Sequence, residues 1–176
     1  MARVTMKALL PVSAPRLWSL VRWDGRLLDW YPDAVDLRVQ GLDKGAHRRL
    51  QLRGGTVLVQ RLEHASRIED AYTYSAADGP YPVTDYLAQI RVLPHGDDRA
   101  TLVWTANFRP AGQSEIRADV RADARAGVRA EAEAEAFIQA LYRNGFDNLS
   151  TLLAGVAGPG GATAGAGPDA VPTLRP

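Results

Sequence analysis

The sequence predicts a single α+β domain in which a curved antiparallel sheet is closed by a long C-terminal helix. Two observations support this prediction. Across residues 33–109, polar and apolar residues alternate with a period of two, and short Gly, Asp and Pro turns interrupt the pattern. Residues 114–153 are predicted to be a helix, and after Glu135 its apolar residues are spaced at three and four. The length of 176 residues suits one domain of this kind.

The composition excludes several classes of function. A net charge of +1 gives no field that would favour nucleic acid or an anionic membrane surface. The sequence has no cysteine, which excludes a disulfide framework and a thiolate nucleophile. His47, His64 and His95 are too scattered for a zinc motif. We therefore expect no metal, no cofactor, no nucleic-acid partner and no membrane partner.

The first ten residues lack the unbroken apolar core of a signal peptide, and no segment is apolar for long enough to span a bilayer. These features predict a cytoplasmic protein.

The N-terminal part predicts one strand followed by two short helices. Residues 4–10 alternate as a strand that Pro11 ends. Ser13 is placed as an N-cap and Pro15 falls in the first turn of the helix that follows. A second short helix is expected over residues 25–31, because Pro32 disfavours helix at the residue before it.

Six further strands complete the predicted sheet, and their short turns indicate an antiparallel meander. Their expected ranges are 35–40, 46–53, 56–65, 68–76, 83–93 and 100–109.

The C-terminal part predicts a long helix and then a tail. Residues 112–135 contain a four-residue repeat, as in Ile116-Arg117-Ala118-Asp119, with almost no bulky side chains. This stretch is interpreted as a solvated helical extension, with a partner-binding arm as the alternative. The apolar helix after Glu135 is expected to dock on the sheet. The domain is predicted to cover residues 1–155, and the Gly/Ala/Pro-rich residues 156–176 are predicted to be disordered.

Strand alternation places polar groups on the buried face of the sheet. Arg48 shares the face of Leu50, and Gln60 shares the face of Leu58. The inward-facing set also includes Asp70, on the face of Tyr72 and Tyr74, and the hydroxyls of Tyr72, Tyr74 and Tyr86. A dry core would leave such groups unpaired at a cost of about 1–3 kcal/mol each, whereas a cavity that holds water or a ligand would satisfy them. The residues expected to line this cavity are Trp30, Gln60, Tyr72, Tyr74, Tyr86, Trp104, Phe108, Phe137, Leu141 and Tyr142. For single residues simpler alternatives stay open: Arg48 could reach the rim or pair with Asp70, and the aromatic residues could be ordinary core.

The order of elements and several short strings resemble the START-like, or SRPBCC, helix-grip proteins, in the polyketide cyclase/dehydrase branch. The strings are Ser13-Ala14-Pro15 with Trp18, Asp29-Trp30-Tyr31-Pro32, Gly45 with Arg48, Gln60-Arg61-Leu62-Glu63, Pro80-Tyr81-Pro82-Val83 with Tyr86, Trp104 with Phe108, and Tyr142 with Leu149. The resemblance runs from Val4 to Leu153. It implies a helix-grip fold, in which seven curved strands wrap round the C-terminal helix and enclose a cavity.

Two groups of relatives, the plant lachrymatory-factor synthases and the abscisic-acid receptors, are similar in the strand region. Both usually carry glutamate in the string that contains Gln60 here, and the synthases carry an arginine that matches Arg48. An amide cannot shuttle a proton at neutral pH, so this difference puts synthase chemistry in doubt and leaves binding intact. The resemblance also implies that loops near Gly54 and Gly79 close over a ligand, as they do in the receptors.

Two functions follow as expectations. The first is a cofactor-independent cyclase, dehydratase or isomerase of secondary metabolism, in which Arg48 stabilises an oxyanion and Asp70 acts as the base. The alternative is a carrier or sequestering protein that binds a small hydrophobic molecule without chemistry. In both cases the partner is a small hydrophobic or polyketide-like molecule, and the protein is a monomer or a homodimer.

Overall fold

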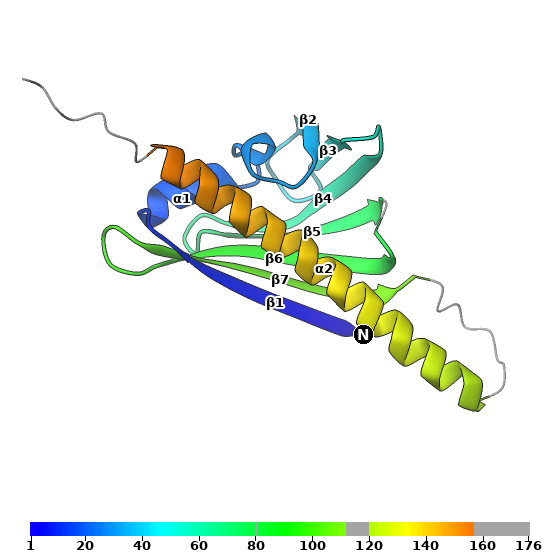
Figure 1. Ribbon diagram of the computed structural model, residues 1–176. Helices are drawn as coiled ribbons and strands as arrows, with labels where there is room; N and C mark the ends of the chain where they lie inside the picture. The colour runs from blue at the N-terminus through cyan, green and yellow to red at the C-terminus, as the bar shows by residue number, and fades with distance from the viewer. Residues whose placement is uncertain (80, 112–119, 157–176) are drawn as a thin grey trace, which may run out of the picture.

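Seven antiparallel strands form one curved sheet, and a long helix lies across its concave face (Figure 1). The computed structural model describes residues 1–79, 81–111 and 120–156. The strands are β1 (Ala2–Leu10), β2 (Ala34–Gln40), β3 (His47–Leu52), β4 (Val57–Ser66), β5 (Ala71–Asp78), β6 (Val83–Pro94) and β7 (Ala100–Pro110). The helices are α1 (Ala14–Val21), a 3-10 turn η1 (Leu27–Asp29) and α2 (Val120–Val156). The predicted α+β class and the helix-grip arrangement are confirmed.

The sheet has the strand order β1-β7-β6-β5-β4-β3-β2, so that β1 and β2 are its two edges. Strands β2 to β7 follow one another as a meander, whereas β1 pairs with β7, with Ala2 opposite Phe108. The pairing register shifts within β4 near Glu63 and within β6 near Asp85. Such irregularities bend a strand and increase its twist, which helps the sheet to curve around α2.

Helix α2 packs its apolar stripe against the sheet. Ile138, Tyr142 and Leu149 are fully buried and follow one another at four and seven residues, as a helix face requires. Helix α1 begins after Ser13, which occupies the N-cap position without a side-chain capping bond, and Pro15 falls in its first turn as predicted. Both helices thus place apolar residues on the concave side of the sheet.

Two predicted elements differ from the structure. The second short helix, expected over residues 25–31, is only the three-residue turn Leu27–Asp29. The strand expected from residue 68 begins at Ala71 instead. Ile68 is 99% exposed and Asp70 has a φ of 44°, so residues 67–70 form a turn that includes a left-handed residue. Asp tolerates that conformation better than most residues, and the turn ends the alternation that the sequence pattern extended too far.

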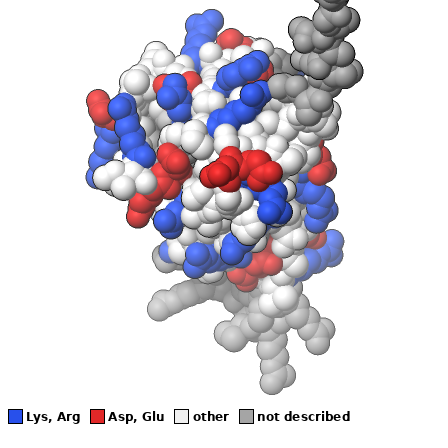
Figure 2. Space-filling model, turned by 90° about the vertical axis from the view of Figure 1, so that its left-hand side faces the viewer, with Lys and Arg blue, Asp and Glu red and all other residues white. Residues whose placement is uncertain are grey.

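The predicted helical extension and tail are described only in part, because residues 112–119 and 157–176 lie outside the described residues. In the part that is described, the first turns of α2 extend past the sheet (Figure 1), Val128 is 70% exposed and Ala134 is buried. Within the described residues, neither helix combines the length and apolar character of a membrane span. Acidic and basic side chains are interspersed over the face on the α1 side (Figure 2).

Candidate functional site

Arg48 on β3 and Gln60 on β4 form the polar centre of the site. The two residues are directly opposite each other in the strand register, and their side chains are 1% and 0% exposed. The Nε atom of Arg48 donates a 2.6 Å hydrogen bond to Oε1 of Gln60. The alternating pattern of both strands correctly placed these residues on the buried face.

The guanidinium group of Arg48 is surrounded by neutral partners. Its Nη1 donates to the carbonyl oxygen of Trp23 at 3.1 Å, and its Nη2 donates to the hydroxyl of Tyr72 at 3.3 Å. Its Cζ atom lies 4.3 Å from the ring centroid of Trp23 and 5.2 Å from that of Tyr74. Cation–π contacts stabilise the charge in part, but no carboxylate within the described residues pairs with Arg48. Within the described residues, the buried cation therefore has hydrogen-bond and ring partners but no counter-charge.

Gln60 contributes the second unsatisfied feature. Its Oε1 accepts from Arg48, whereas its Nε2 is buried and has no hydrogen-bond partner within the described residues. A buried donor without an acceptor costs about 1–3 kcal/mol, so such atoms are rare in folded proteins. Arg48 and Gln60 together present a positive charge and a free N–H group to the same interior region.

The aromatic residues predicted to line the cavity satisfy most of their polar atoms with one another. Trp104 Nε1 donates to the Tyr74 hydroxyl at 3.1 Å, and the Tyr86 and Tyr142 hydroxyls are 2.8 Å apart. The ring of Trp104 also stacks on Tyr142 with centroids 4.0 Å apart. The expectation that these hydroxyls need a guest molecule is therefore wrong. Gln60, and not the tyrosines, carries the argument for a polar ligand.

Burial makes all six tyrosines weaker acids than a tyrosine in water. It is the largest cause of a raised pKa for Tyr31, Tyr72, Tyr74, Tyr81, Tyr86 and Tyr142. The charge of Arg48 acts in the opposite direction and lowers the pKa of Tyr72 in part. These phenols stay neutral at physiological pH and can donate hydrogen bonds to a ligand oxygen.

A surface pocket of about 290 Å³, here called the mouth pocket, opens between α2 and the loops next to β2 and β5. Tyr31, Tyr81 and Leu141 line it, and the hydroxyls of the two tyrosines share a hydrogen bond. Phe137, which is 37% exposed, packs its ring 5.4 Å from that of Tyr81. Phe137 and Leu141, predicted as cavity residues, therefore lie at this opening.

A chain of neighbouring rings leads from the mouth pocket to the interior. The ring of Tyr81 neighbours that of Tyr86, and Tyr74 then connects Tyr86 with Tyr72, with successive centroids 5.9, 6.1 and 5.7 Å apart. Tyr72 contacts the guanidinium of Arg48. Neighbouring aromatic rings thus connect the residues of the mouth pocket with the polar centre.

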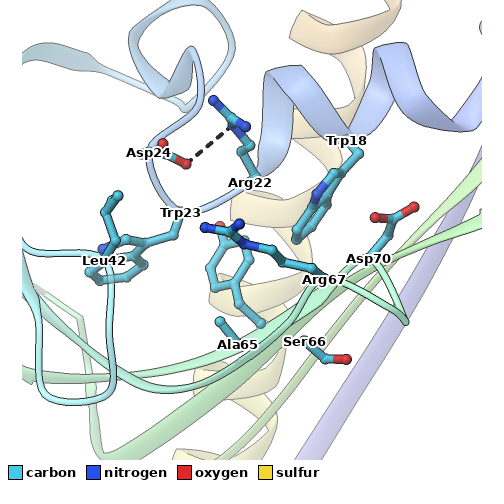
Figure 3. A pocket seen from close by; sticks show the side chains of 10 residues that line it. Trp18, Arg22, Trp23, Asp24, Leu42, Ala65, Ser66, Arg67 and Asp70 are labelled. Atoms are coloured by element: carbon cyan, nitrogen blue, oxygen red, sulfur yellow. Dashed lines mark ion pairs between the residues drawn. The ribbon is translucent and has the colours of Figure 1, made fainter.

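Asp70 does not join this centre. It lies in the turn between β4 and β5 and lines a second pocket together with Trp18 and Tyr72 (Figure 3). Neither an ion pair nor a side-chain hydrogen bond joins it to Arg48, whose donors go to other groups. The proposed pairing of Arg48 with Asp70 is therefore wrong, because the left-handed turn removes Asp70 from the face of Tyr72.

The remaining predicted residues belong to the core. Trp30 is buried against Trp104 at a centroid distance of 5.6 Å, and Phe108 is buried on β7. Sequence reasoning missed Trp23 and gave no site role to Tyr31 or Tyr81. All three lie in connecting segments, where no periodicity assigns a face. The available signal was an aromatic residue next to proline for Tyr31 and Tyr81, and two residues before glycine for Trp23.

Comparisons with known proteins place this geometry among related folds. The sequence model of the family described as "Polyketide cyclase / dehydrase and lipid transport" matches residues 1–154. Among curated proteins, none matches. The structure of XoxI from Bacillus cereus is similar at 25% identity and a TM-score of 0.71, over 89% of this chain and 98% of that chain.

More distant structures share the fold. The ZhuI aromatase/cyclase from Streptomyces sp. R1128 has 15% identity and a TM-score of 0.69, over 92% of this chain and 99% of that chain. A START superfamily protein from Mycobacterium smegmatis has 11% identity and a TM-score of 0.66, over 88% and 99% of the two chains.

Proposed function

The chain belongs to the polyketide cyclase/dehydrase and lipid transport family, and on this premise we propose that it binds a small hydrophobic, oxygenated molecule between its sheet and α2. One observation carries the proposal. The buried guanidinium of Arg48 has no counter-charge within the described residues, and the neighbouring Nε2 of Gln60 has no acceptor. A ligand oxygen with negative charge would complement both groups at once.

The surroundings of Arg48 support an aromatic or polyketide-like ligand. The residues around Arg48 are mostly aromatic, and aromatic rings suit contact with a flat apolar molecule. The mouth pocket would be the entrance from solvent, and Tyr81, in one of the loops that the family resemblance assigned to closure, lines it. A phenolate, enolate or carboxylate fits this combination better than an uncharged hydrocarbon.

We place binding without proton transfer, as a carrier or sequestering protein, ahead of catalysis. Gln60 is an amide and cannot act as a base. Asp70 lies in the turn of the second pocket, and burial raises the pKa of the tyrosines. Of the candidate bases, Asp70 therefore lies away from Arg48, and Gln60 and the tyrosines carry no negative charge that could accept a proton.

A cofactor-independent cyclase, dehydratase or isomerase is the second candidate. It is favoured by the family, whose description includes cyclases and dehydrases, and by the likeness to the ZhuI aromatase/cyclase. In that reaction Arg48 would stabilise an enolate oxygen as charge develops on it. Folding of the substrate within aromatic walls would then supply the rest of the rate enhancement.

The test compares the purified chain with two variants of adjacent arginines on β3. Arg48→Met removes the buried cation, and Arg49→Met is the matched control on the exposed face of the same strand. Binding of a phenolic anthraquinone is measured by fluorescence quenching. We expect Arg48→Met to weaken binding at least tenfold and Arg49→Met to change it less than twofold. Equal affinities in the two variants, or no saturable binding by the parent chain, would overturn the proposal.

The same proteins separate the two candidate functions. A poly-β-ketone thioester is incubated with each, and products are followed by mass spectrometry. Conversion by the parent chain above the buffer rate, lost in Arg48→Met, supports the enzyme. Binding without conversion supports the carrier. Native mass spectrometry of the protein as purified would also show a retained ligand.

A further inference from the structure

The second pocket, here called the α1 pocket, has a volume of about 340 Å³ and lies between the end of α1 and the turn from β4 to β5. Ser66 ends β4 at this pocket and Tyr72 stands near the start of β5. Tyr81 of the mouth pocket instead follows the far end of β5. The two pockets therefore lie at opposite ends of β5 and open to solvent separately.

Three aromatic rings form one wall of the α1 pocket. The ring of Tyr72 lies 6.1 Å from Trp18 and 5.9 Å from Trp23, measured between centroids. Trp23 and Tyr72 are buried and held by the core, whereas Trp18 is half-buried and partly exposed to solvent. Rings at these spacings suit contact with a further flat ring, and edge or offset contacts stabilise such pairs.

Four charged side chains line the pocket beside this wall, and only two of them are paired with each other within the described residues. Arg22 and Asp24 form an ion pair at 3.2 Å across one side of the pocket (Figure 3). Arg67 and Asp70 stand on the turn, and within the described residues neither has an ion-pair partner. In Figure 3 the Arg67 side chain extends from the turn toward the Trp23 side of the pocket.

Arg48 adds a further positive charge behind the wall. Its guanidinium bonds to the Trp23 carbonyl and the Tyr72 hydroxyl, and both of these residues also line the α1 pocket. The two arginines and two aspartates that line the pocket balance each other, so the charge of Arg48 behind the wall leaves one net positive charge, buried where solvent screens it least. An anion in the pocket is favoured over a cation.

We propose that the α1 pocket is a second binding site, which takes a small aromatic carboxylate. The aromatic ring packs against Trp18, Trp23 and Tyr72, and the carboxylate accepts hydrogen bonds from Arg67, whose fork of N–H groups matches two carboxylate oxygens. The volume suits a molecule of one or two fused rings. This site lies on the other side of Trp23 and Tyr72 from the Arg48 guanidinium, and its carboxylate contact is with Arg67, so it does not require the ligand proposed above.

Tryptophan signals test the site directly, because the chain has four tryptophans and only two of them line the pocket. Trp30 and Trp104 lie in the core, with their indole nitrogens bonded to Leu20 and Tyr74. The full chain, labelled with 15N, is titrated with 2-naphthoate, and the four indole N–H signals are followed by NMR. We expect saturable shifts of the Trp18 and Trp23 signals, with smaller shifts of the other two.

Charge recognition is tested with a neutral probe and two arginine variants. 2-Naphthamide, which has the same rings and no charge, should bind at least fivefold more weakly. Arg67→Gln should weaken 2-naphthoate at least fivefold and leave 2-naphthamide unchanged. Arg99→Gln, in the exposed turn before β7, is the matched control and should bind both probes like the parent chain.

Each of the following results would overturn the proposal: no saturable shift, shifts confined to Trp30 and Trp104, equal binding of the two probes, or parent-like affinity in Arg67→Gln. Arg48→Met distinguishes this site from the one between sheet and α2. We expect this variant to lose anthraquinone binding and to bind 2-naphthoate more weakly but still saturably, with shifts at Trp18, because Arg67 holds the carboxylate. Loss of both ligands would overturn the second site.

Discussion

Arg48 and Gln60 face each other across β3 and β4, and the 2.6 Å hydrogen bond between them joins a cation to a neutral amide. Within the described residues, the buried charge of Arg48 lacks the carboxylate that usually accompanies one. This arrangement is costly for folding, and in the proposed function the ligand would supply the missing negative charge.

Gln60→Glu should stabilise the fold and weaken ligand binding. A glutamate would supply the counter-charge of Arg48 and remove the unpartnered Nε2 group. We expect the free energy of unfolding at neutral pH to rise by about 1–3 kcal/mol. The affinity for an anionic anthraquinone should fall at least tenfold. Urea unfolding and fluorescence titration measure the two effects, and Gln89→Glu on the exposed face of β6 is the control. A less stable variant with unchanged affinity would contradict the argument.

The six tyrosines should fail to ionise in the folded protein near their usual pKa. Burial raises the pKa of each, so the folded state favours the neutral phenol. The stability they contribute is fully present below the unfolded pKa of about 10 and is lost as the pH rises above it. Phenolate absorbance during an alkaline titration should therefore increase together with loss of circular dichroism. Ionisation of several tyrosines near pH ~10 with an intact fold would be inconsistent with this burial.

The hydroxyls of Tyr86 and Tyr142, 2.8 Å apart, should be energetically coupled. Tyr86→Phe and Tyr142→Phe each leave a buried hydroxyl without this partner, at an expected cost of about 1–3 kcal/mol. The double variant removes both hydroxyls and keeps both rings, including the stacking of residue 142 on Trp104. Its cost should be smaller than the sum by at least about 0.5 kcal/mol, as measured by chemical unfolding. Strict additivity would show that the two hydroxyls do not depend on each other.

Gly145 on α2 should resist replacement by alanine. A Cβ at this position would lie 3.0 Å from Trp104 and 3.6 Å from Trp30, two buried indoles that have little room to move. We expect Gly145→Ala to lower the free energy of unfolding by about 1–2 kcal/mol, although alanine is the better helix former. Gly155→Ala on the same helix meets no atom within 4 Å and should be neutral or stabilising. Thermal unfolding compares the two, and equal effects would refute the close packing.

Alternation within single strands was enough to predict the buried faces of β3 and β4, and hence the inward direction of Arg48 and Gln60. The bond between them was not predictable, because register depends on the length and shape of the intervening turn. Asp70 was misplaced for a related reason. Its positive φ ends the period of two, and the sequence pattern carries no mark of that change.

Contacts between aromatic residues were also beyond prediction from the sequence. The pairing of the Tyr86 hydroxyl with Tyr142 joins a strand to a helix far along the chain, and which of several buried hydroxyls pair is decided by tertiary packing. Trp23 lies outside every periodic segment, so neither its contact with Arg48 nor its place in the α1 pocket could be inferred. The alternation of polar and apolar residues predicts which face of a strand is buried, whereas tertiary packing decides which side chains contact each other.

The pairing of β1 with β7 also bears on how the chain is made and folded. Ala2 pairs with Phe108, so β1 cannot form its sheet hydrogen bonds until β7, the last strand of this sheet along the chain, has been synthesised. Closing so long a loop is entropically costly and slows folding relative to proteins with local contacts. Until β7 is complete at Pro110, β1 has no strand to pair with, and the β7 side of the meander has no neighbouring strand. The strand that is synthesised first is therefore among the last to be hydrogen-bonded into the sheet.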